Sequence, residues 1–299
     1  MRKKQFDLHL HTYYSDGKDS PRKIFQLAKN AGLRLISITD HNSIGHVREE
    51  EALARKFRIN YLPGVELSCK YEGRHIHLAG YGFNPNSGVL ATTLQKIQRG
   101  RRKGILQVVS KLRKSGFHIT SPEILGLKAE YYGLAHIIGL LMKKRNDRRR
   151  ILSEVGSTDI FAIINHYFSA ASDAYVPERY LPAVSAIKLI RRAGGIVALA
   201  HPGAHLRYQD DRLVAQLKKA GLECLEVFTP KHNWDQVVHY EMLAKKLNLI
   251  ITAGSNFHED FHQNDIPIVT PIGFMKTPGR IFDKFNSYAR RKLGFRLQY

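Results

Sequence analysis

Apolar and polar positions follow two different rhythms along the first part of the chain. Residues 21–31 repeat apolar side chains at helical spacing, after Ser20 as a cap and Pro21 in the first turn, which predicts a helix that ends at Gly32. Short apolar runs typical of buried strands occupy residues 6–10, 34–41, 59–68 and 75–83.

The same alternation returns after residue 180. Helices are predicted at 182–195, 211–222 and 239–249, and an apolar run that we expect to be a strand follows each of them. Together with the first part of the chain this makes about seven strands, most of them separated by helices. Such an order favours an α/β fold with a parallel sheet or a closed barrel.

The middle of the chain has a different pattern. From Ile105 to Leu112, and in later segments, apolar residues recur at helical spacing without intervening strand-like runs. We therefore predict a helical insertion domain at 91–178 within an α/β domain built from 1–90 and 179–299.

Charge changes this picture, because the chain has 47 Lys and Arg against 26 Asp and Glu, a net charge of +21. Residues 96–150 alone contain 15 basic and three acidic residues, and so carry +12 of that charge. A positive field of this kind attracts polyanions and phosphorylated small molecules, although a solvated basic surface has the same composition.

The sequence contains neither a targeting nor a membrane-crossing signal. No apolar run approaches the roughly 18–20 residues that cross a bilayer, and the basic N-terminus lacks the apolar stretch of a signal peptide. Cys69 and Cys224 each lie in a strand-like run, which favours small core residues in a reducing compartment. We expect a cytoplasmic protein without a membrane partner, and the sequence does not indicate its oligomeric state.

Side chains that can bind metals stand where apolar runs end. His9 and His11 are two residues apart in a predicted strand, so both rings point to one face. The carboxyl ends of strands carry the working residues of α/β barrels. Imidazoles and carboxylates without a thiolate cluster suit Mn²⁺, Zn²⁺ or Fe²⁺, and two or three such ions would bind phosphate oxygens and activate water. The candidates are His9, His11, Asp16, His41, Glu66, His77, His136, His201 and His258, with His75 as an alternative to His77.

Six ordered stretches make the sequence recognisable. DLHLHTYYSDG, SITDHNS, LPGVELS, HIHLAGYGF, LAHPG and AGSNFH resemble the motifs of the PHP (polymerase and histidinol phosphatase) family in order and spacing. The chain is most similar to bacterial members that act on nucleoside 3′,5′-bisphosphates and on RNA 5′ ends, which share the helical insertion and AYVP at 174–177. The resemblance implies a distorted seven-stranded (β/α)7 TIM-like barrel.

The resemblance also implies two or three divalent ions, with Mn²⁺ as the first choice. The expected ligands are His9, His11 and Glu66 for the first position, Glu66, His77 and His136 for the second, and Asp16, His41 and His258 for the third. By the same resemblance His201 is a catalytic residue that contacts the substrate phosphate or protonates the leaving oxygen. Asp40 is the second expected catalytic residue, whose role would be to orient a ligand imidazole.

Three positions depart from the family pattern. Asn256 stands where the family usually has an aspartate that binds the first metal. We expect Asn256 to be a ligand too, but its amide oxygen brings no charge, so the first position should be weaker. Leu134 and Ala204 replace arginines that grip phosphate in relatives. We expect other basic residues to bind the substrate in their place, namely Arg207, Lys144, Arg145 and Arg148.

These features predict a metal-dependent phosphoesterase whose basic insertion caps the active site. The expected substrate is a nucleoside 3′,5′-bisphosphate that loses its 3′-phosphate, or the 5′ end of a short RNA attacked by 5′–3′ exoribonuclease activity. One alternative is a histidinol-phosphate-type phosphatase. The other is a catalytically weakened nucleic-acid-binding PHP protein, for which Asn256, Leu134 and Ala204 would be the signs.

Overall fold

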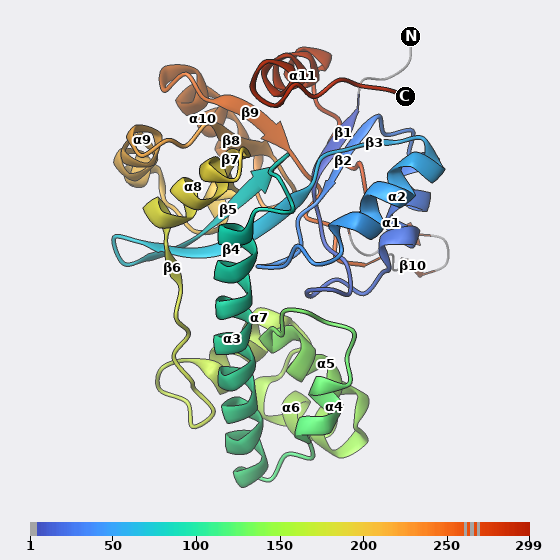
Figure 1. Ribbon diagram of the computed structural model, residues 1–299. Helices are drawn as coiled ribbons and strands as arrows, with labels where there is room; N and C mark the ends of the chain where they lie inside the picture. The colour runs from blue at the N-terminus through green and yellow to red at the C-terminus, as the bar shows by residue number, and fades with distance from the viewer. Residues whose placement is uncertain (1–4, 260–261, 264–265, 268–269) are drawn as a thin grey trace.

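The computed structural model describes residues 5–259, 262–263, 266–267 and 270–299, and it has a mixed α/β fold (Figure 1). Three parallel strands form one sheet, in the order β1 (Phe6–Leu10), β2 (Leu35–Ile38) and β3 (Asn60–Tyr61). Six strands form the larger sheet, in the order β6 (Leu181–Pro182), β4 (Gly64–Tyr71), β5 (Arg74–Tyr81), β7 (Ile196–Ala200), β8 (Cys224–Phe228) and β9 (Ile250–Ala253). A short antiparallel pair is made by β10 (His262–Gln263) and β11 (Ile266–Pro267).

Single bridges join the two larger sheets at one rim. Leu10 at the end of β1 pairs with Phe257 after β9, and His41 after β2 pairs with Glu66 of β4. Among the described residues the strands therefore form separate sheets rather than one continuous closed ladder of seven strands. The bridges nevertheless bring the carboxyl ends of β1 and β2 against the larger sheet.

The larger sheet is not all parallel, contrary to the prediction. β5 runs antiparallel to both β4 and β7. The cause is the tight turn at Glu72 and Gly73, whose φ values of 43° and 78° match the primed turns that connect hairpin strands. The sequence signal for this turn is the Glu72-Gly73 pair, which lies between the predicted strands at 59–68 and 75–83.

Helices cover the outer faces of the sheets (Figure 1). The predicted cap at Ser20 is confirmed, because its side chain accepts a hydrogen bond from the Lys23 N–H at 3.1 Å. The helices outside the middle of the chain are α1 (Pro21–Asn30), α2 (Val47–Phe57), α8 (Ala183–Arg192), α9 (Asp211–Lys219), α10 (Trp234–Lys246) and α11 (Gly279–Leu293). Short 3₁₀ turns lie at Pro202–Ala204 (η1) and Tyr208–Asp210 (η2).

The middle of the chain forms a group of helices, here called the helical lobe, with its own apolar core. Its helices are α3 (Gly88–Lys114), α4 (Ser121–Leu125), α5 (Leu134–Lys143), α6 (Arg145–Val155) and α7 (Ile160–Phe168). α3 runs unbroken across the predicted boundary at residue 91. Leu90 and Leu94 at its start belong to the core of the sheets, whereas Ile105 and Leu112 belong to the core of the lobe. One helix thus ties the two cores together.

The structure also bears on the two cysteines and on membrane-spanning helices. Cys69 and Cys224 are free and fully buried, as expected for core residues. Within the described residues no helix has both the length and the apolar character needed to span a bilayer.

Candidate metal centre

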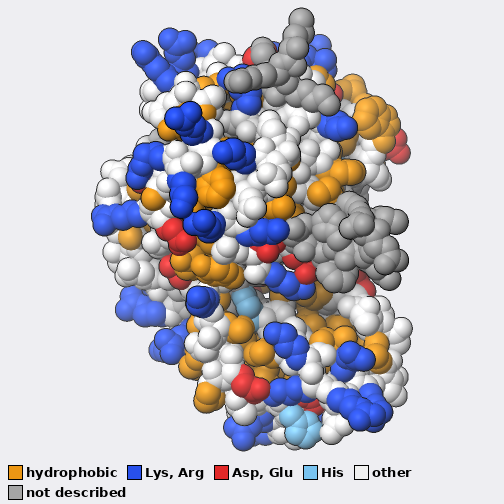
Figure 2. All heavy atoms as spheres, turned by 90° about the vertical axis from the view of Figure 1, so that its right-hand side faces the viewer, with side chains coloured by type: hydrophobic (Ala, Val, Ile, Leu, Met, Phe, Trp, Pro, Cys, Tyr) orange, Lys and Arg blue, Asp and Glu red, His pale blue; other side chains and the backbone are white. Residues whose placement is uncertain are grey.

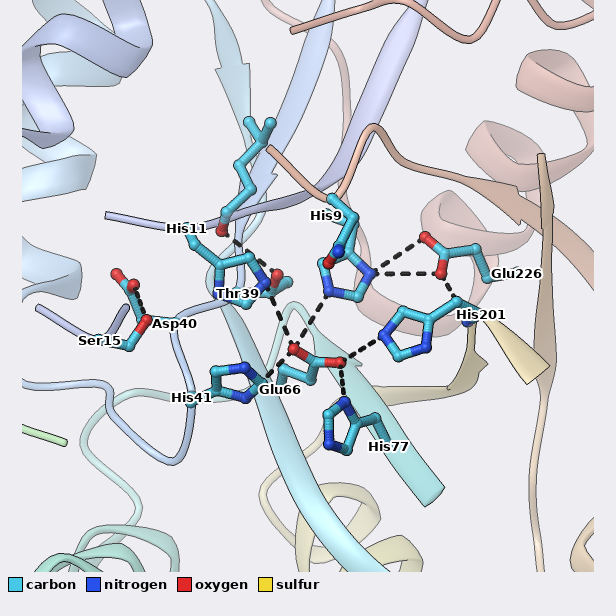
Figure 3. A network of polar contacts seen from close by, with 12 residues as sticks. His9, His11, Ser15, Thr39, Asp40, His41, Glu66, His77, His201 and Glu226 are labelled. Atoms are coloured by element: carbon cyan, nitrogen blue, oxygen red, sulfur yellow. Dashed lines mark hydrogen bonds and ion pairs between the residues drawn. The ribbon is translucent and has the colours of Figure 1, made fainter. Parts of the chain in front are cut away.

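Most of the predicted ligands converge on one buried carboxylate, Glu66 of β4 (Figure 3). Its Oε2 lies 3.2 Å from His9 Nε2 and 3.2 Å from His41 Nδ1. Its Oε1 lies 2.8 Å from His77 Nδ1 and 2.9 Å from His201 Nε2. These side chains come from or directly follow β1, β2, β5 and β7, so the rim joined by the two bridges carries the site.

His11 connects this group to a second one around Asp16. Its Nε2 lies 3.4 Å from Glu66 Oε2, and its Nδ1 lies 3.5 Å from Asp16 Oδ1. Asp16 Oδ2 in turn lies 3.5 Å from His41 Nε2 and 3.5 Å from His258 Nε2. The predicted ligands therefore form one continuous cluster with two carboxylate centres.

The period-two alternation of β1 produced this arrangement. The rings of His9 and His11 lie on the same face with centroids 5.2 Å apart, as the sequence predicted. Leu8 and Leu10 point to the opposite side and are fully buried in apolar cores.

Electrostatics keeps both carboxylates ionised. Burial raises the pKa of Glu66, but the surrounding imidazoles of His77, His9 and His41 outweigh it and hold that pKa well below its usual range. Burial likewise raises the pKa of Asp16, and the neighbouring His41 and His258 lower it further than burial raises it. Two ionised carboxylates surrounded by imidazoles are a ligand set for cations.

Several buried polar atoms of this cluster make no hydrogen bond to a described residue, which bears on whether these residues fit a metal. Buried polar atoms without a partner cost free energy, so native proteins rarely keep several together. Among the described residues, the buried atoms of this cluster that make no hydrogen bond of good geometry are His9 Nε2, His11 Nδ1 and Nε2, His41 Nδ1, Glu66 Oε2, His77 Nδ1 and His201 Nδ1. Divalent ions would satisfy most of these atoms at once, so the donor set fits Mn²⁺, Zn²⁺ or Fe²⁺.

One buried carboxylate of the site, Glu226 of β8, escaped the sequence analysis. Its Oε1 lies 3.1 Å from His9 Nδ1, and its Oε2 accepts a hydrogen bond from the backbone N–H of His201 at 2.7 Å. It therefore holds two of the clustered histidines from behind. The signal was the single charged residue in the apolar run 224–228, which a buried strand tolerates only when that charge is paired.

Glycine at position 254 makes room for this pair. A Cβ added at Gly254 would lie 2.2 Å from His9 Cβ and 2.8 Å from Glu226 Oε1. The end of β9 can approach β1 this closely only because residue 254 has no side chain.

Asp40 occupies a different place from the one predicted. It accepts hydrogen bonds from the Thr12 backbone N–H at 2.8 Å, the Thr12 hydroxyl at 2.6 Å and the Ser15 hydroxyl. On its other side His46 Nε2 lies 3.4 Å away. Asp40 thus secures the loop between His11 and Asp16, and the imidazole that it faces is not one of the predicted ligands.

His136 and Asn256 are placed by local contacts. His136 Nδ1 accepts the Gly133 N–H at 2.9 Å at the start of α5, and burial lowers the pKa of its ring although the charge of Asp16 opposes this. Of the predicted metal ligands, Asp16 is the one whose charge acts most on His136. Asn256 has a φ of 51°, and its carbonyl oxygen accepts from His258 Nδ1 at 2.7 Å, which turns His258 Nε2 toward Asp16.

Figure 2 shows Lys and Arg side chains spread over the whole face in view, and the predicted substrate-binding cations come from α6 and from the segment beside η2. Lys144 is engaged within the helical lobe, with Nζ 2.6 Å from Glu123 Oε1. Arg145 and Arg148 are exposed on α6, and Arg207 is exposed beside η2.

Comparison with known proteins is consistent with these observations. The PHP domain profile matches residues 7–232. A 3′,5′-nucleoside bisphosphate phosphatase of Chromobacterium violaceum is 28% identical over 279 residues, which cover 89% of this chain and 94% of that protein. A 5′-3′ exoribonuclease of Haemophilus influenzae is 29% identical over 262 residues, covering 85% and 90%. A solved amidohydrolase structure from Chromobacterium violaceum superposes with a TM-score of 0.74 at 26% identity, covering 88% of this chain and 92% of that one.

Proposed function

The chain belongs to the PHP domain family, and on that premise we propose that it is a metal-dependent phosphoesterase acting on nucleotides. The observation that carries the proposal is the cluster around Glu66, in which five imidazoles face one buried, ionised carboxylate. The names of the relatives suggest the substrate, a nucleoside 3′,5′-bisphosphate that loses its 3′-phosphate or the 5′ end of a short RNA.

The contacts support a division of the ligands into three positions. We assign His201 to the second position in place of His136, because its Nε2 shares Glu66 Oε1 with His77. The ligands are then His9, His11 and Glu66 for the first position, Glu66, His77 and His201 for the second, and Asp16, His41 and His258 for the third. When bound there, divalent ions supply positive charge for the phosphate oxygens and a water acidic enough to act as the nucleophile.

The remaining residues of the site prepare this ligand set. Glu226 accepts a hydrogen bond from His9 Nδ1, so that Nε2, which faces Glu66, would be the nitrogen that binds an ion. His232 donates from Nδ1 to the Val227 carbonyl at 2.9 Å, and its Nε2 accepts the Gly203 N–H at 2.9 Å. These bonds secure the turn that carries His201.

The helical lobe supplies the basic surface of the proposed substrate path. We propose that 91–178 is an insertion that caps a PHP barrel formed by 1–90 and 179–299, with α3 as the connecting element. Arg145, Arg148 and Arg207 are exposed and would bind the nucleotide phosphates.

A phosphate-release assay tests the proposal. Chelator-treated protein supplied with Mn²⁺ is incubated in parallel with a nucleoside 3′,5′-bisphosphate, a 5′-phosphorylated RNA oligonucleotide and histidinol phosphate. We expect a nucleoside 5′-phosphate from the first substrate or stepwise release of mononucleotides from the second. Exclusive hydrolysis of histidinol phosphate would overturn the substrate assignment, and tight RNA binding without turnover at saturating Mn²⁺ would overturn the enzymatic one.

A pair of variants ties the activity to the site. Glu66→Gln removes the charge of the central carboxylate and should lower kcat at least about a hundredfold, because the lost charge stabilisation amounts to several kcal/mol. Glu241→Gln makes the same change in an exposed carboxylate paired with Arg280, and it should leave kcat unchanged.

A further inference from the structure

Behind the second metal position lies a further histidine, His205. Its ring centroid is 4.9 Å from that of His77 and 5.2 Å from that of His201. One nitrogen from each of these three residues can be chosen so that all three atoms lie within 4.8 Å of one another. Nitrogens that share a tetrahedral ion lie roughly 3.4 Å apart, so binding requires these rings to move together by up to about 1.4 Å.

The chain holds His205 in place on both sides. Its backbone N–H donates to the Pro202 carbonyl at 3.0 Å, which closes the short turn after His201. The next residue, Leu206, is anchored in the main apolar core. A Cβ added at Gly203 would lie 2.7 Å from His232, so the turn packs directly on the loop after β8. The imidazole is therefore attached to a backbone with little freedom to move.

The Nε2 atom of His205 is buried and has no hydrogen-bond partner among the described residues. A histidine that merely fills space in a core normally satisfies such a nitrogen. A histidine that grips phosphate would instead direct an N–H toward open solvent. A buried nitrogen without a hydrogen-bond partner, beside His77 and His201, suits a metal ligand.

We propose that His205 is an additional protein ligand of the second metal position, alongside Glu66, His77 and His201. This inference rests on the proposed function, because it concerns the same ligand cluster. It gives the second metal position a stronger ligand set than the first, which the sequence did not indicate. The first position has an amide, Asn256, where a carboxylate is expected, whereas the second gains an imidazole. The second position should therefore fill first and hold its ion most tightly.

Metal binding of the full-length protein tests the inference without reference to activity. Apoprotein prepared with a chelator is titrated with Zn²⁺ by calorimetry in the presence of a competing chelator. We expect the tightest equivalent to weaken at least about tenfold in His205→Ala, while the weaker equivalents keep their affinity. His166→Gln, a change in a histidine of α7 paired with Glu154, serves as the control and should bind like the wild type. Unchanged affinity and stoichiometry in His205→Ala would overturn the inference.

A measurement on the wild type covers the case in which the variant does not fold. X-ray absorption at one equivalent of Zn²⁺ counts the imidazoles around the ion. Three imidazoles would support the inference, because the first and third positions contain two each by our assignment. Two imidazoles would overturn it. Phosphate release is assayed separately at saturating metal. If the enzyme releases phosphate but binds metal equally well with and without His205, only this inference is refuted. If metal binding depends on His205 but no phosphate is released, only the proposed function is refuted.

Discussion

Glu226 and His9 meet in the interior of the protein, with Glu226 Oε1 3.1 Å from His9 Nδ1 and neither side chain more than 1% exposed. The opposite nitrogen of His9, Nε2, lies 3.2 Å from Glu66. Burial alone lowers the pKa of His9, but the charges of Glu226 and Glu66 raise it well above its usual range. An ion at this position would therefore replace a proton on Nε2, while Glu226 keeps the proton on Nδ1.

Neutralising Glu226 should weaken the first metal position. In Glu226→Gln the amide oxygen can still accept hydrogen bonds, but the charge that favours metal-bound His9 is gone. We expect about a 10- to 100-fold loss of Mn²⁺ affinity at one site, measured by calorimetry, with little change in secondary structure. Glu241→Gln is the matched control on the surface. Equal Mn²⁺ affinities in the two variants would show that Glu226 does not support the site.

Restoring a carboxylate at position 256 should have the opposite effect. Asn256→Asp adds a charged ligand on the rim, so at limiting Mn²⁺ we expect about tenfold higher occupancy and a higher turnover. The readout is metal content by mass spectrometry after dialysis. Asn248→Asp makes the same change at an exposed residue with the same φ of 51°, and it should not alter metal content. Metal content that stays unchanged in Asn256→Asp would refute the idea of a weak first position.

Stability should fall at alkaline pH because of His46. Burial lowers the pKa of His46, but Glu50, 2.7 Å from Nδ1, and Asp40 outweigh burial and raise the pKa to about 9. A raised folded-state pKa adds stability that is complete below the unfolded value near 6.5 and disappears as pH rises through about 9. Burial raises the pKa of Asp40 to about 6, so Asp40 titrates only at the acid edge of this window.

The size of that effect can be measured by urea unfolding of the metal-free protein. Between about pH 6 and pH 10 the wild type should lose about 3 kcal/mol of unfolding free energy more than His46→Gln loses. Parallel pH profiles for the two proteins would show that His46 is not protonated in the folded state.

Exposed arginines of α6 should affect substrate capture rather than chemistry. The double variant Arg145→Ala/Arg148→Ala removes two positive charges, and with an RNA substrate we expect KM to rise about three- to tenfold while kcat stays within about twofold. The dependence of kcat/KM on salt should also become shallower. Lys245→Ala/Lys246→Ala on α10 removes the same charge from another exposed surface, and it should change neither quantity. An equal effect of both double variants would indicate that only net charge matters.

The helices and most of the ligands could be predicted because their signals are local. The Ser20 cap, the pair His9 and His11, and the helical texture of the middle segment follow from spacing along a few residues. The direction of β5 does not follow from the apolar runs, because it is set by the two-residue turn at Glu72 and Gly73, which makes β4 and β5 a hairpin.

The sequence by itself determined which chemistry is available: imidazoles and carboxylates at the ends of apolar runs, and an excess of basic charge in one segment. Only the tertiary structure decided which of those groups meet. It brought His201 and His205 to His77, set Glu226 behind His9, and turned Asp40 toward a loop and His46. The physical reason is that strand pairing and close packing between distant segments fix side-chain neighbours to within an ångström, and no pattern within a single segment encodes those distances.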